Sequence, residues 1–184
     1  MTTLLISLWC LLSPAALLPA HTFARNHDGK VLSPRPEMAA LFVINCIIFL
    51  TPGNLMSHLT LSSFFTFMAQ LAWLDRSNHW LPQCFTTTFI VAGGLLSGSV
   101  SHLLAALMLW LLFYALERCP AGPGRGDKWL CAGLGMWLGL HIALLITGAA
   151  LGLILSYSKF FTRHTSGQPL APWVFIASLP LLFH

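Results

Sequence analysis

Charge is what this sequence has least of. Only 8% of its 184 residues are Asp, Glu, Lys or Arg, while 57% are hydrophobic and the mean hydropathy is +0.77. A soluble domain carries roughly 25% charged residues, so a chain this poor in charge cannot cover a globule with polar surface. We therefore expect an integral membrane protein that has the lipid bilayer as its main partner.

The apolar runs also lack the period-two alternation of membrane-spanning strands. In hydrocarbon every backbone N–H and C=O must be paired within the chain, and continuous apolar runs satisfy this as helices. The expected fold class is all-α, a polytopic transmembrane helical bundle with about four crossings and a short re-entrant or interfacial helix. The expected location is an endomembrane or the plasma membrane.

Two further absences bear on the binding partners and on disulfide bonds. The nine Lys and Arg residues stand singly in loops, without a basic run interleaved with aromatics, so we expect no nucleic acid and interpret them as topology signals. The five cysteines include no C-x-x-C pair and are odd in number, which is not a disulfide framework. Cys84 and Cys119 flank apolar segments and are weak candidates for palmitoylation.

The N-terminal part divides into two expected segments. Residues 1–24 resemble a signal anchor or signal peptide, with Ala20 and Ala24 as candidate cleavage points. No Lys or Arg precedes this run, and basic residues follow it, which favours a retained anchor with its N-terminus outside. Residues 25–37 form an expected polar linker, and its Ser33-Pro34-Arg35-Pro36 sequence is predicted to be non-helical.

Residues 38–156 are the expected transmembrane core. Met38–Leu50 is predicted to be the short re-entrant or interfacial piece, with a helical hairpin over Met38–Leu74 as the alternative. Thr51-Pro52-Gly53-Asn54 is a helix-start signal, which predicts a crossing over Leu55–Leu74. The two longest apolar stretches, Phe85–Leu116 and Trp129–Ser156, are each predicted to be one further crossing.

The C-terminal residues 157–184 are a polar linker and an apolar tail, which we expect to lie in the membrane interface, with insertion into the bundle as the alternative. Lys and Arg divide six to three between the two sides whether Met38–Leu74 crosses once or as a hairpin, so the positive-inside rule does not choose between them. In the single-crossing arrangement, Arg76 lies on the opposite side of the membrane from Arg118, Arg125 and Lys128.

Small residues recur at helical spacing in the two longest stretches. One row passes from Gly94 and Gly98 to His102, and another follows Gly135 and Gly139, with Gly148 and Gly152 beside it. Such rows let helix backbones approach closely in lipid. They predict helix packing, either within the chain or between copies.

His102 and His141 are each placed near the middle of a predicted crossing. An ionisable side chain at that depth is a functional candidate. The two imidazoles could ligate haem b axially or relay protons. We expect instead that each makes an interhelical hydrogen bond, for which Ser97, Ser101 and Thr147 are available.

No catalytic signature is present. The sequence from Gly94 to Gly98 is not G-x-S-x-G, both predicted core crossings lack an acid, and His58, His79 and Cys84 do not have metal-ligand spacing. Arg125-Gly126-Asp127 matches an integrin-recognised tripeptide but is equally a turn before the last helix. The sequence favours a non-enzymatic membrane protein that acts through helix packing, as an oligomer or as a small subunit of a membrane complex, with no cofactor expected. The alternatives are a haem-b electron-transfer subunit and a small transporter or channel.

Overall fold

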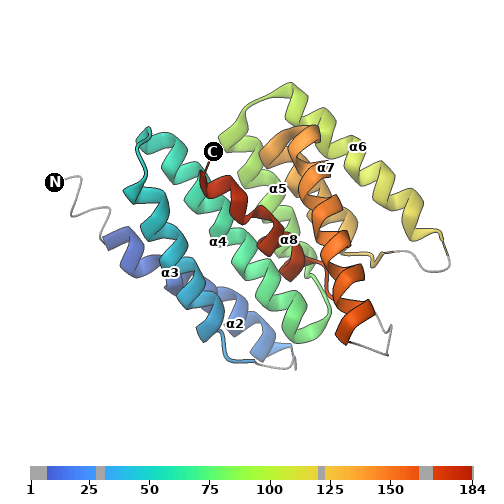
Figure 1. Cartoon of the computed structure of the whole chain (residues 1–184), viewed down its shortest axis with the longest axis horizontal. Coiled ribbons are helices and arrows are strands. Elements are labelled where there is room, and N and C mark those ends of the chain that lie inside the picture. Colours follow the sequence, from blue (N-terminus) through green and yellow to red (C-terminus); the bar gives the residue numbers. More distant parts are fainter. Residues whose placement is uncertain (1–7, 28–31, 120–122, 162–167, 184) are drawn as a thin grey trace.

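The computed structural model describes residues 8–27, 32–119, 123–161 and 168–183, and within these ranges it contains helices and no strands (Figure 1). After a helical stretch at 8–12, the elements are η1 (Ser13–Leu17), α2 (Leu18–Asn26), α3 (Arg35–Leu50), α4 (Leu55–Asn78), α5 (Gln83–Ser97), α6 (Val100–Glu117), α7 (Asp127–Phe161), α8 (Ala171–Ser178) and η2 (Leu179–Phe183).

The predicted polar linker is shorter than expected. Helix α2 continues through Asn26, and α3 already begins at Arg35 with a proline in its first turn. The expectation of a non-helical Ser33–Pro36 is therefore wrong at its C-terminal half, because proline is tolerated at a helix start, where its missing N–H has no intrahelical partner anyway. Ala20 and Ala24, the candidate cleavage points, are buried inside α2.

Helices α3 and α4 form an antiparallel hairpin. Glu37 at the start of α3 pairs with Arg76 at the end of α4, with 2.8 Å between Oε1 and Nη2. At the other end the rings of Phe49 and His58 have centroids 5.6 Å apart. The Asn54 side chain caps α4 by accepting from the Met56 amide at 3.2 Å. Helix α4 therefore starts at Leu55 as predicted, but the expected cap, Thr51, instead ends α3.

The prediction of one crossing over Phe85–Leu116 is wrong. Gly98 ends α5 in the left-handed conformation, with φ 57°, and α6 begins after Ser99. Glycine adopts this conformation without the steric penalty of a side chain. The row from Gly94 through Gly98 to His102 is therefore divided between two helices, and His102 lies in the first turn of α6 instead of mid-crossing.

Helix α7 is interrupted at Gly139, whose φ of 75° and ψ of 171° are not helical. Asp127, at the start of α7, lines one cavity with Leu170, and the rings of Tyr157, near the end of α7, and Trp173 have centroids 5.2 Å apart. Both ends of α7 therefore lie beside the start of α8, whereas about 30 residues of straight helix span about 45 Å, so α7 folds back on itself at Gly139. The predicted single crossing over Trp129–Ser156 is wrong for this reason, and His141 lies beside the bend.

The first half of α7 packs between α5 and α6 (Figure 1). Helix α5 is parallel to the first half of α7, because Phe89 lies against Gly133 and, four residues further along both helices, Gly93 lies against the Trp137 ring. Helix α6 is antiparallel to the first half of α7, since the rings of Trp110 and Trp129 have centroids 5.8 Å apart and His102 contacts Met136. Helices α5 and α6 therefore form a second hairpin, whose open end meets the start of α7.

The core lies between α4 and the first half of α7. Phe64 of α4 and Trp137 of α7 are in edge contact, with ring centroids 5.7 Å apart, and residues 130–137 are all buried. Helix α8 packs against both α4 and α7 and buries Val174 and Ser178. The apolar tail is therefore inserted into the bundle, which was the alternative to the expected interfacial position.

Two helices in the described part of the chain are long and apolar enough to cross a membrane, α6 and the Asp127–Phe160 part of α7. Helix α4, an expected crossing, is absent from this class and buries most of its C-terminal half. The outer surfaces of α6 and of the second half of α7 are apolar, with Leu103 56% exposed and Leu155 69% exposed.

Candidate functional site

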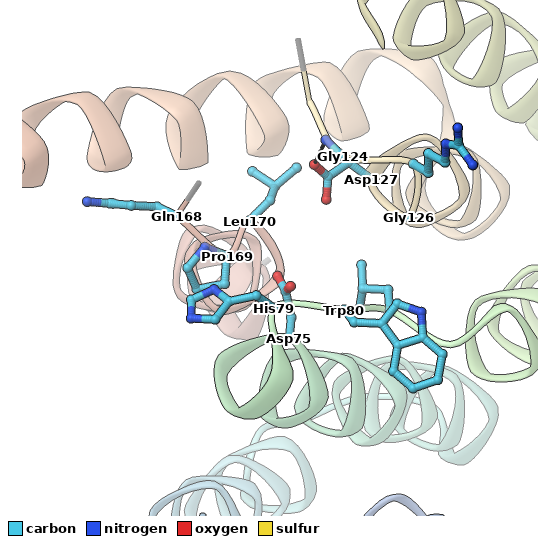
Figure 2. Close-up of a pocket in the computed structure, with 11 residues that line it drawn as sticks. Asp75, His79, Trp80, Gly124, Gly126, Asp127, Gln168, Pro169 and Leu170 are labelled. Carbon is cyan, nitrogen blue, oxygen red and sulfur yellow. Dashed lines mark hydrogen bonds between the residues drawn. The ribbon is translucent and has the colours of Figure 1, made fainter. Parts of the chain in front are cut away.

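A cavity of about 220 Å³ opens where α4 ends, α7 begins and the chain approaches α8 (Figure 2). Its lining comes from three separate segments: Asp75, His79, Trp80, Leu81, Gly124, Arg125, Gly126, Asp127, Gln168, Pro169 and Leu170. Two carboxylates and one imidazole thus share one cavity, and all three come from residues that the sequence places in loops or at segment ends.

Asp75 lies in the last turn of α4 and is buried. Its Oδ2 accepts a hydrogen bond of 2.8 Å from the Ala171 amide, and the Leu170 amide also donates to it. A carboxylate in this position satisfies amides of the first turn of α8 and complements the helix dipole. Burial nevertheless raises the pKa of Asp75 above its usual value, because the backbone hydrogen bonds offset only part of the lost hydration.

Asp127 is the first residue of α7 and lies in the polar link before the apolar stretch. Its Oδ2 accepts from the Gly124 amide at 2.8 Å and so closes the turn before α7. Burial, with a smaller contribution from the negative charge of Asp75, raises the pKa of Asp127 to about 6. This carboxyl therefore exchanges its proton close to neutral pH.

The remaining polar groups of the cavity come from tight turns. His79 ends α4 in the left-handed conformation, with φ 51°, and its amide donates to the Asp75 carbonyl at 2.8 Å. Arg125 is exposed beside Asp127. Because the Asp127 carboxylate is directed into the cavity and bound to Gly124, the Arg125-Gly126-Asp127 tripeptide is not presented as an exposed recognition loop.

Sequence reasoning did not predict that Asp75 and Asp127 line one cavity. It assigned every carboxylate to a linker or a segment end, and it placed the loop after α4 and the loop before α7 on opposite sides of a crossing. The α5–α6 hairpin instead returns the chain to the end from which it started. The spacing of Asp75 and Asp127 in the sequence contains no signal that they line one cavity, because their proximity depends on the turn at Gly98.

His102, predicted as a haem ligand or an interhelical hydrogen-bonding group, is half-buried against the bend of α7. Its Nδ1 lies 3.0 Å from the Met136 carbonyl oxygen, and a carbonyl only accepts, so Nδ1 carries the proton. Gly139 lies against the other side of this ring, where an added Cβ would be 3.3 Å from Nε2. An interhelical hydrogen bond is therefore present, to a backbone carbonyl instead of the serine or threonine hydroxyls proposed from the sequence.

His141 has different surroundings. It is exposed and follows the Gly139 bend by two residues, whereas His102 is enclosed between α6 and α7. The haem-b hypothesis and the transporter hypothesis both stay predictions. Among the residues that the structure describes, no group of three or more His, Cys, Asp or Glu side chains is arranged to hold a metal ion.

The six glycines predicted for helix packing fall into three classes. Gly94 and Gly135 face the chain itself, since an added Cβ would lie 3.7 Å from the Met136 sulfur and 2.8 Å from the Ala106 amide nitrogen, respectively. Gly98 and Gly139 form turns. Gly148 and Gly152 have no heavy atom within 4 Å of an added Cβ, so their side of α7 is open.

No protein-family model, no curated protein and no solved structure matches this chain. The assignment of function therefore rests on its sequence and its structure.

Proposed function

We propose that this chain is an integral membrane protein without chemistry of its own, which acts by binding other transmembrane helices through the second half of α7. The observation that carries the proposal is the open side of α7 at Gly148 and Gly152, where nothing lies within 4 Å of an added Cβ. Glycines four residues apart allow another helix to approach closely in lipid. The partner is a second copy of the chain or a helix of a membrane complex.

The surface around these glycines supports this proposal. Leu145 is 61% exposed and Leu155 is 69% exposed on the same half of α7. An apolar surface of this kind is stable against lipid or against another apolar helix but not against water. The count of about four crossings stays a prediction, since among the described residues two helices, α6 and α7, have the length and hydropathy to cross a membrane.

The proposal is tested by the size of the purified protein in mild detergent. The wild type should elute as an assembly of more than one chain, with the composition given by mass spectrometry. Gly148→Leu combined with Gly152→Leu should yield the monomer at unchanged helical content, because the added side chains obstruct close helix approach without meeting the chain's own atoms.

Ala115→Leu is the matched control. It adds the same apolar bulk at an exposed position of α6 and should leave the assembly intact. A wild type that is monomeric and co-purifies with no other protein would contradict the proposal, as would an assembly insensitive to both glycine substitutions.

A further inference from the structure

We propose that the chain enters the membrane from one side only, as a series of helical hairpins, with its charged end among the anionic headgroups of the cytoplasmic leaflet. This inference rests on the proposed membrane location. It differs from the arrangement expected from the sequence, in which the loops after α4 and before α7 lie on opposite sides.

Three helical hairpins point in the same direction. The α3–α4 hairpin, the α5–α6 hairpin and the folded α7 each turn at one end of the molecule, at 51–54, at Gly98-Ser99 and at Gly139 (Figure 1). Their open ends meet at the other end, where segments of α4, α7 and the approach to α8 line one cavity. A bilayer that holds the bundle upright therefore has all the turns at one depth and all the open ends at the other.

In the described part of the chain, every charged residue lies at the end of the molecule where the hairpins have their open ends. Arg76 pairs with Glu37, and Lys128 with Glu117, all at the open ends of the hairpins. The other described charged residues lie at the same end: Arg25, Arg35, Asp75, Arg118, Arg125, Asp127 and Lys159. The turns at 51–54 and 98–99 contain no charged residue.

The outward face of this charged end is positive. All four described acids are buried or half-buried, whereas five of the described cations are exposed: Arg25, Arg35, Arg118, Arg125 and Lys159. Basic residues in short loops accumulate on the cytoplasmic side of membrane proteins, and each is attracted to an anionic leaflet. The charged end therefore fits the cytoplasmic headgroup layer.

Two native cysteines report on this topology directly. Cys84 in the first turn of α5 and Cys119 after α6 are both exposed. We would label single-cysteine variants with a membrane-impermeant maleimide in cells whose plasma membrane is opened by digitonin, which leaves internal membranes sealed. Both cysteines should react without further detergent. In the arrangement expected from the sequence, only one of them would react.

A third single-cysteine variant, Ser101→Cys, places an exposed reporter at the uncharged end and should not react from the cytosolic side. Reaction of Cys84 and Cys119 from opposite sides, or of all three from the cytosol, would overturn the one-sided topology. Carbonate extraction of the same membranes tests the location separately, because a protein released by carbonate contradicts the proposed function itself, whatever the labelling pattern.

The headgroup contact has its own measurement. In phosphatidylcholine nanodiscs, adding phosphatidylserine should raise the thermal midpoint, and salt should reduce the rise. The double variant Arg25→Gln, Arg35→Gln should show a smaller rise than the wild type. An equal midpoint in both lipid compositions would overturn the contact with anionic headgroups.

Discussion

The carboxylate of Asp75 accepts a hydrogen bond from the backbone amide of Ala171, 96 residues later in the chain, at 2.8 Å. The end of α4 thereby holds the start of α8, and the apolar C-terminal segment is fixed inside the bundle. A buried acid in this position satisfies amides that have no partner within α8 itself. The contact helps to hold the short apolar tail in the core.

Removing this acceptor should loosen α8. Asp75→Leu leaves the Leu170 and Ala171 amides unpaired in a buried place, and we expect the free energy of unfolding to fall by about 1–3 kcal/mol. Asp75→Asn keeps an acceptor oxygen, and Asn caps helices about as well as Asp, so it should change stability little. Hydrogen exchange of the Ala171, Trp173 and Val174 amides measures both effects. Equal exchange in the two variants would show that the carboxyl does not hold α8.

The cavity should make stability depend on pH. The pKa of Asp127 is about 6 in the folded protein against 3.8 ordinarily, so the folded state binds more protons between these values and stability falls as pH rises through this range. The pKa of Asp75 is raised in the same direction. A pKa difference of this size changes the free energy of unfolding by at most about 3 kcal/mol. The thermal midpoint should be higher at pH 4.5 than at pH 7.5, and Asp127→Asn should flatten the dependence; a midpoint that rises with pH contradicts the assignment.

The sequence was sufficient for the helical class and for several local features. The sequence predicted the start of α4 at Leu55, although Asn54 and not Thr51 caps it, and Asp127 begins α7 after a turn, as its sequence indicates. These features depend on a few neighbouring residues. The helix class depends only on composition and on the length of the apolar runs.

The hairpins could not be predicted in the same way. Gly98 and Gly139 lie inside continuous apolar runs, and glycine is common within straight membrane helices. Whether such a glycine turns the chain is decided by packing around it, here by α5 and α6 closing on the first half of α7. The cavity with its two carboxyls follows from those turns, so it was missed together with them.

The bend in α7 requires glycine. Gly139→Ala should destabilise the fold by about 1–2 kcal/mol, because φ of 75° is strained for a residue with a side chain. The added Cβ would also approach Nε2 of His102 to 3.3 Å. Gly148→Ala, a change in an open and helical place on the same element, should be neutral or stabilise by up to about 1 kcal/mol. Thermal unfolding in detergent compares the two, and equal midpoints would mean that the bend does not depend on Gly139.

A buried polar network joins the N-terminal segment to α3 and α4. Asn45 is fully buried, its Nδ2 donates to the Ser13 hydroxyl at 2.9 Å and to the Leu41 carbonyl at 2.9 Å, and its Oδ1 accepts from Ser62. Such bonds between membrane helices contribute about 0.6 kcal/mol on average and up to about 1.7 kcal/mol. Asn45→Ala and Ser13→Ala should each lower stability, and together they should cost less than the sum, because the second substitution removes a partner that is already lost. Strictly additive losses in urea or thermal unfolding would show that the Asn45–Ser13 bond does not fasten the N-terminal segment to α3.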